Sequence, residues 1–245
     1  MAEIGGELID TQHSTMRSYA RQFGLELEVM EDPSLEPRYY IDGQFYDEAE
    51  VVEEVRAFIP AMNRDLQSLT SPDPENATDA DRALDYTTLA DYLETRGAGH
   101  VARAVIDSSY TGEYGLEIAE QSALNLLLFM HADRRSKFTP FGQFSDEKYH
   151  VIGGNGQIAH GLAGRIGGGA LRYGHSLVAA RHRADGAVVL TFDTAGGAVE
   201  HVADAVIFAV PFTVLRRVDL SGLNLPAFKR RAIDELIYGT NAKVM

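Results

Sequence analysis

The sequence predicts an α/β fold with two interleaved domains, and three observations support this prediction. Apolar residues recur with helical spacing through much of the first half of the chain. The last hundred residues read as short strands separated by Asp-Gly and Gly-Gly turns. The chain has 245 residues, of which 45% are hydrophobic, so it is long enough to bury more than one core. Helices followed by a strand-rich end are typical of an α/β protein.

The composition narrows the classes of function. A net charge of −14 repels nucleic acid and anionic lipid, which leaves small molecules or proteins as the expected partners. No run of apolar residues is long enough to span a membrane. The chain has no cysteine, which excludes disulfides and thiolate metal sites. The first residues, "MAEIGGELID", lack the features of a signal peptide and read like the interior of a domain, so a cytoplasmic location is the default expectation.

Two local patterns predict the first elements. A helix is predicted over residues 10–24, where the apolar residues recur at i, i+3, i+4 and i+7 and a glycine follows the last turn: Met16, Tyr19, Ala20, Phe23 and Gly24. The stretch "RYYIDGQFY" (38–46) then predicts a β-hairpin. Asp42 and Gly43 can supply the positive φ angles of its type I′ turn.

The middle of the chain is predicted to be helical. A long helix is expected from Asp47 to about Leu69, with one apolar stripe and a kink at Pro60. The stripe consists of Val51, Val55, Phe58, Met62, Leu66 and Leu69. A polar loop is expected over 71–81. Helices are predicted again over 87–97, where Thr88 and Asp91 have the spacing of a capping box, and over about 116–133.

The strand-rich end is divided by the turns Asp185-Gly186 and Gly196-Gly197. The continuous apolar run Ala205–Val210 predicts a strand that is buried on both faces and ends at Pro211. A short helix is predicted over "PAFKRRAIDELIYG" (226–239). "TNAKVM" (240–245) then predicts the start of another strand.

The stretch "KYHVIGGNGQIAHGLAGRI" (148–166) places Gly154, Gly156 and Ala159 at the positions of G-x-G-x-x-G/A, the fingerprint of a dinucleotide phosphate loop. Such a loop requires an acidic residue about 20 residues further on, to bind the ribose. Here those positions hold Tyr173, Gly174 and His175, and the next acid lies in a hairpin turn. We therefore interpret the glycines as a tight strand-to-helix turn and reject the phosphate loop.

The same stretch resembles the strand-turn-helix of the flavin-containing amine oxidases, the family of monoamine, polyamine and L-amino-acid oxidases. Other stretches match this family in the same order, among them "IGGELIDTQHSTMRSYARQFGLEL", "DYTTLADYLETRG", "ADAVIFAVPFTVLRRV" and "YGTNAKVM". The resemblance implies part of a Rossmann-like FAD domain and a largely helical substrate domain. It assigns 1–30 and 150–216 to the FAD domain, 31–149 to the helical substrate domain and 217–245 to the start of the substrate-domain sheet.

The resemblance also implies residues that contact FAD. Gly5 and Gly6 match glycines that let the backbone approach the flavin closely. Backbone N–H groups at Glu7 and Leu8 would face the isoalloxazine ring. Leu177 matches a strand residue whose backbone pairs with the adenine edge, and its register could slip to Val178. Without the resemblance, the glycine pair reads as a plain turn and Leu177 as a core residue.

Lys243 is the predicted catalytic residue. On its own, a lysine in this strand pattern reads as a solvated edge residue. The match of "YGTNAKVM" instead implies the lysine that holds a water against flavin N5. A buried ammonium would orient that water and favour negative charge on the reduced flavin. No metal ligand is expected, because the eight histidines lack ligand spacing.

The implied reaction transfers hydride from the carbon beside an amine nitrogen to FAD. The substrate would be a primary or secondary amine or an amino acid, the product an imine, and O2 would be reduced to H2O2. The family's N-terminal G-x-G-x-x-G and C-terminal flavin-closing segment have no match here, so we expect a central fragment that alone binds FAD weakly or not at all. Two alternatives stay open. One is a related flavin enzyme that desaturates carbocycles or porphyrinogens, and the other is a non-catalytic protein-binding remnant with an acidic face at Glu48, Glu50, Glu53 and Glu54.

Overall fold

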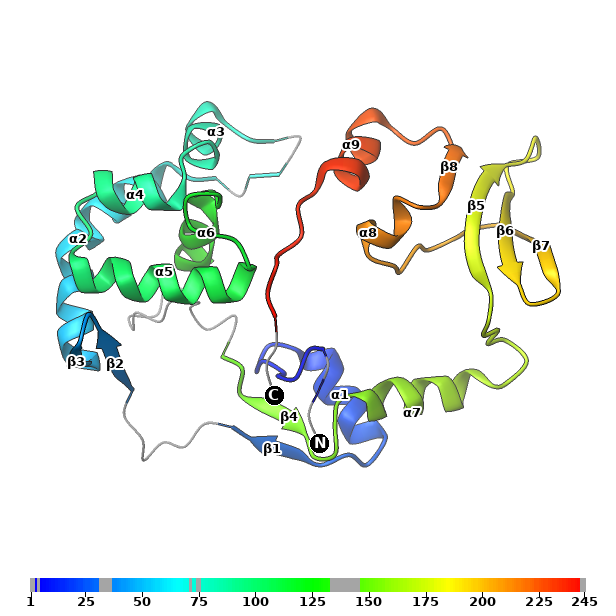
Figure 1. Cartoon of the computed structure of the whole chain (residues 1–245), viewed down its shortest axis with the longest axis horizontal. Coiled ribbons are helices and arrows are strands. Elements are labelled where there is room, and N and C mark those ends of the chain that lie inside the picture. The colour runs from blue at the N-terminus through cyan, green and yellow to red at the C-terminus, as the bar shows by residue number, and fades with distance from the viewer. Residues whose placement is uncertain are drawn as a thin grey trace. The chain divides into compact units, whose positions relative to one another are not determined.

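A computed structural model of the protein describes residues 3, 5–30, 37–70, 72–73, 76–132 and 146–242 (Figure 1). The chain divides into two compact units, and each is described by itself. The first unit comprises Met1–Gly161 and Gly239–Met245, and the second comprises Leu162–Tyr238. The division into FAD-domain and substrate-domain segments stays a prediction.

The helices are α1 (Ser14–Gln22), α2 (Glu48–Ser68), α3 (Asp79–Asp85), α4 (Leu89–Thr95), α5 (His100–Tyr114), α6 (Leu124–Ala132), α7 (Gly156–Ile166), α8 (Phe212–Leu215) and α9 (Ala227–Glu235). The strands are β1 (Leu27–Val29), β2 (Arg38–Ile41), β3 (Gln44–Asp47), β4 (Tyr149–Val151), β5 (Ser176–His182), β6 (Val188–Thr194), β7 (Gly197–Ala203) and β8 (Asp219–Gly222). This mixture of helices and sheets agrees with the predicted α/β class.

Helices α2, α4, α5 and α6 form the main core of the first unit. The predicted stripe of α2 is confirmed, because Val51, Val55, Phe58 and Met62 are all buried in this core. Helix α2 continues as one element through Pro60, and the kink stays a prediction. The hairpin is confirmed: β2 pairs antiparallel with β3, and Asp42 and Gly43 have φ angles of 49° and 84°.

Several predicted boundaries in the first unit were wrong. Helix α1 begins at Ser14 rather than Asp10, because the Asp10 carboxylate accepts a hydrogen bond from the Glu147 N–H (2.7 Å) instead of capping the helix. Helix α6 begins at Leu124 rather than near residue 116. The backbone before it pairs elsewhere, since the Leu89 N–H donates to the Gln121 carbonyl at 2.8 Å.

Two helices of the first unit were not predicted. Helix α5 has its buried residues at Val101, Ala102, Val105, Ile106 and Tyr110. Helix α3 begins at Asp79, inside the segment predicted to be a loop, because Thr78 and Asp81 form a capping box there. Parts of that segment lie outside the described residues.

The second unit contains a four-stranded sheet in the order β7-β6-β5-β8. Strands β5, β6 and β7 are antiparallel neighbours joined by the two predicted glycine turns, and β8 adds in parallel to β5. The predicted helix before residue 240 is confirmed as α9. A small core joins the sheet to α8 and α9: Ala180, Val188, Leu215, Val218, Leu220, Leu223 and Ile233.

Two predicted strands are absent from the described part of the chain. Residues 205–210 are not a strand. Val206 and Phe208 pack against the core of the second unit, while Ile207 is 92% exposed, so one face of the run is open. A strand needs a neighbour to bond its N–H and C=O groups, and no described strand pairs with this run. Residues 240–242 are not a strand either, and the residues after them lie outside the described part.

Asp81 makes the stability of the first unit sensitive to acid. Its buried carboxylate accepts hydrogen bonds from Thr78 and Thr70, through the backbone N–H and the hydroxyl of each. These bonds, led by that from the Thr78 backbone, lower the pKa of Asp81 below its ordinary value. A depressed folded-state pKa contributes stability above the unfolded pKa of about 4, and this stability is lost as pH falls through the folded value.

We therefore expect Asp81→Asn to lower the unfolding midpoint at pH 7 and to weaken its dependence on pH below about 4. Asp79→Asn is the matched control, since this carboxylate lies on the same helix and is fully exposed. Thermal unfolding followed by circular dichroism between neutral and acidic pH measures both effects. Equal acid sensitivity in wild type and Asp81→Asn would contradict the assignment.

Candidate functional site

The predicted flavin-facing segment, residues 5–8, lies beside the turn that connects β4 to α7. An antiparallel bridge between Ile9 and Tyr149 sets this register. The Ile9 N–H donates to the Tyr149 carbonyl at 2.6 Å, and the Tyr149 N–H donates back at 2.9 Å. Ile9 is buried, so the bridge is anchored in the interior of the unit. Two segments about 140 residues apart in the sequence are thereby brought together.

The turn itself is built by glycines, as predicted. Gly153 and Gly154 have φ angles of +86° and +107°, in the region that side chains rarely adopt. The next residue, Asn155, directly precedes α7, and its backbone N–H donates to the Glu3 carboxylate. A phosphate loop would offer this helix N-terminus to an external anion. Here a carboxylate of the same chain bonds to it, which supports the rejection of a phosphate loop.

The Asn155 side chain connects the turn to residues 5–8. Its Nδ2 donates to the Gly6 carbonyl (3.1 Å) and to the Glu7 carbonyl (2.9 Å). Its Oδ1 accepts from the Val151 N–H at 3.1 Å. The segment that was predicted to face the flavin is therefore held through its carbonyl groups.

Gly5 and Gly6 are exposed, and their surroundings differ from those of the turn glycines. A Cβ added to either residue would meet no atom of the described residues within 4 Å, and neither has a φ in the left-handed region. Neither the backbone conformation nor the packing of this chain therefore requires glycine at these positions. The space beside the two glycines is open among the described residues, and close approach of a flavin ring to them stays a prediction.

Leu177 lies in the second unit, in β5 opposite Phe192 of β6. Its side chain packs partly against the core of that unit. The pairing shifts between Leu177 and Ala179, and Val178 between them is 41% exposed. Pairing with β8 begins only at Ala179. The start of β5 thus extends past its described parallel neighbour, and the pairing of its backbone with adenine stays a prediction.

Lys243 lies outside the described residues, so its position is not part of the structure. The two described residues at 240 and 241 are anchored to the C-terminal end of α5. The Thr240 N–H donates to the Gly115 carbonyl at 2.9 Å, and Asn241 Nδ2 donates to the Gly112 carbonyl at 2.6 Å. Gly115 has a φ of +65°, and a side chain there would collide with Asn241.

A group of carboxylates lies close to this part of the unit. Burial raises the pKa of Glu113, on α5, and the nearby charges of Glu147 and Asp10 raise it further. Asp10 also lies 3.4 Å from His13 Nε2. Among the residues that the structure describes, no group of three or more potential ligands is arranged to hold a metal ion. None of the described helices is long and apolar enough to cross a membrane.

Sequence reasoning missed Asn155 and Asp10 as residues that shape this region. Asn155 lies in the middle of the glycine stretch, but its partners are 148 and 149 residues away, so no local pattern reveals them. Asp10 was read as a helix residue.

The model of the flavin-containing amine oxidoreductase family matches residues 1–245, and the chain belongs to this family. The predicted family is confirmed. Its flavin agrees with the predicted cofactor, FAD.

Solved structures of putrescine oxidase show the same fold. A double mutant from a redesign of cofactor binding has a TM-score of 0.77 and 19% identity, over 97% of this chain and 53% of the other. The wild-type enzyme bound to putrescine has a TM-score of 0.75 and 19% identity, over 97% of this chain and 53% of the other. The chain thus spans about half the length of these structures. The roles of Gly5, Gly6, Glu7, Leu8, Leu177 and Lys243 stay predictions.

Proposed function

We propose that this chain forms part of the flavin site and much of the substrate domain of an FAD-dependent enzyme that oxidises an amine or amino acid to an imine, with O2 reduced to H2O2. The observation that carries the proposal is the segment 5–8, which Asn155 holds through its carbonyls and whose two glycines face open space. The family and the fold support the same class of reaction.

Residues 5–8 fit the flavin part of FAD. The space beside Gly5 and Gly6 is open, and the amides of Glu7 and Leu8 would bond the edge of the ring. The proposed adenine contact near Leu177 lies in the second unit and is a separate proposal. When bound, the flavin supplies a hydride acceptor and a route for electrons to O2. The protein's own contribution is to position the flavin and the substrate relative to each other. We propose that the Lys243 ammonium holds a water beside the reacting centre.

The charge of the chain supports a cationic substrate. At −14, its field attracts protonated amines and repels anions. A putrescine oxidase bound to putrescine is among the similar structures, which favours a small amine over a carbocycle or a porphyrinogen.

The acidic face offers no support for a protein-binding remnant. Glu50 forms a capping box with Asp47, and Glu54 accepts from the Ala102 N–H at the start of α5. Glu53 pairs with Arg56 at 2.6 Å. These carboxylates have partners within the chain that account for them.

Peroxide release in the presence of a large excess of FAD tests the proposal. Diamines, monoamines, amino acids, a carbocyclic substrate and a porphyrinogen are compared. We expect FAD-dependent peroxide release from amines or amino acids. Oxidation of the carbocycle or the porphyrinogen without oxidation of any amine would contradict the proposed function.

A further inference from the structure

Asn155 bonds two successive carbonyls of the segment 5–8, and its amide orientation is set by its partners. Oδ1 lies 3.1 Å from the Val151 nitrogen, which can only donate. The Nδ2 group must therefore face the carbonyls of Gly6 and Glu7, at 3.1 and 2.9 Å. Both carbonyls point to the same side of the segment, toward Asn155.

Because the peptide bond is planar, the direction of each carbonyl also fixes the direction of the N–H group in the same peptide unit. The Gly6 carbonyl shares a peptide plane with the Glu7 N–H, and the Glu7 carbonyl shares one with the Leu8 N–H. In a trans peptide the oxygen and the hydrogen lie on opposite sides, and the described residues contain no cis peptide. The Glu7 and Leu8 N–H groups therefore both point away from Asn155. In an extended strand successive N–H groups point in opposite directions. The shared direction of the Glu7 and Leu8 N–H groups is therefore attributed to the two hydrogen bonds from Asn155.

We infer that Asn155 is a positioning residue that aims the Glu7 and Leu8 amides together at the accepting edge of the flavin ring. The inference rests on the proposed function, because it takes the flavin as the acceptor. Two donors fixed in direction before binding stabilise negative charge without reorganising when it develops. Asn155 acts through the backbone of residues 6–8 and does not itself touch the cofactor.

The turn does not need the Asn155 Nδ2 group for its own structure. Gln157 Nε2 donates to the carbonyls of Ile152 (2.9 Å) and Gly154 (3.1 Å). The Gly154 N–H donates to the Val151 carbonyl at 2.8 Å. These bonds lie inside the turn, whereas both Nδ2 bonds of Asn155 leave it. The Nδ2 bonds of Asn155 and the Nε2 bonds of Gln157 can therefore be removed separately by mutation.

Asn155→Asp is the sharpest variant, because it keeps the size and the oxygen that faces Val151 but loses both donors to the carbonyls. Gln157→Ala is the matched control, since it removes hydrogen bonds of the same turn without touching residues 6–8. In the absence of flavin, we expect Asn155→Asp to shift the NMR amide signals of Glu7 and Leu8, besides that of its direct partner Val151, and to leave those of α7 beyond its first turn in place. The control should leave Glu7 and Leu8 unchanged. Unchanged Glu7 and Leu8 signals in Asn155→Asp would overturn the inference.

Titration with FAD, followed at the same two amides, tests the role in binding. Asn155→Asp leaves the Glu7 and Leu8 amides without a fixed direction, and this is expected to weaken FAD binding about tenfold, against less than about twofold for Gln157→Ala. Equal FAD affinity in wild type and Asn155→Asp would overturn the positioning role. Because this chain alone is expected to bind FAD weakly, the titration extends to millimolar FAD, and wild-type amides that still do not respond would contradict the proposed flavin site. The flavin-free comparison would still decide whether Asn155 sets the direction of the amides.

Discussion

Lys243→Met is expected to slow flavin reduction or reoxidation by about 10²-fold in the FAD-loaded enzyme. Methionine keeps the volume of the side chain nearly constant but removes the charge and the hydrogen bonds that would hold a water beside the flavin. Loss of one preorganised donor in a water-poor site has effects of this size. Substrate affinity should change much less, because the lysine is proposed to act on the flavin side of the site.

Stopped-flow measurement of each half-reaction separates these effects. Lys229→Met is the matched control, because this lysine lies on the exposed face of α9. The control should reduce and reoxidise at the wild-type rate. If Lys243→Met also does so, the catalytic assignment of Lys243 is wrong.

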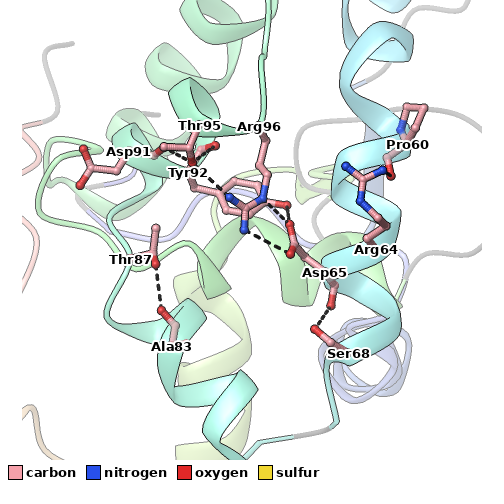
Figure 2. Close-up of polar contacts among 10 residues, drawn as sticks. All are labelled: Pro60, Arg64, Asp65, Ser68, Ala83, Thr87, Asp91, Tyr92, Thr95 and Arg96. Carbon is pink, nitrogen blue, oxygen red and sulfur yellow. Dashed lines mark hydrogen bonds and ion pairs between the residues drawn. The ribbon is translucent and has the colours of Figure 1, made fainter.

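Asp65→Ala is expected to destabilise the helical core by about 2 kcal/mol. The Asp65 carboxylate accepts from the Tyr92 hydroxyl at 3.0 Å and from Arg96 Nε at 2.7 Å, and so joins α2 to α4 (Figure 2). Tyr92 is fully buried, and burial together with Asp65 raises its pKa. Removing the carboxylate leaves a buried hydroxyl and a guanidinium without their shared partner.

Chemical denaturation measures this loss, with Asp91→Ala as the control. Asp91 is an exposed carboxylate on the same helix as Tyr92, so its removal should cost less than about 0.5 kcal/mol. Tyr92→Phe removes only the hydroxyl and should cost about 1 kcal/mol. The double variant Asp65→Ala/Tyr92→Phe should lose less stability than the sum of the two single losses, because the two residues share one hydrogen bond. Strict additivity would show that this bond contributes little.

The parts of the fold that the sequence predicts are those with local signals. The α2 stripe and the Asp42-Gly43 turn each lie within one element, so periodicity and turn chemistry suffice to find them. The buried positions of α5 also have helical spacing, although its polar second half, with Gly112, hides the pattern. Periodicity applied to residues 101–110 alone would have found this helix.

The failures depend on partners that are distant in sequence. The run Ala205–Val210 has the composition of a buried strand, but composition does not show whether a neighbouring strand is present to pair with it. Asp10 has the residue type of a helix cap, yet its carboxylate bonds the backbone of Glu147. Motif resemblance found Gly5 and Gly6, while Asn155, which holds the adjoining carbonyls, is revealed only by the fold.

The most direct test of the flavin site is the FAD affinity of Gly6→Val, measured beside its thermal unfolding midpoint. The first added carbon, Cβ, meets no described atom within 4 Å, so the midpoint should stay within about 2 °C of wild type. The same side chain would occupy the space proposed for the flavin ring and separate it from the two amides. We predict that FAD binding weakens by about tenfold or more at an unchanged unfolding midpoint. Wild-type FAD affinity in Gly6→Val would contradict a flavin site at Gly5–Leu8.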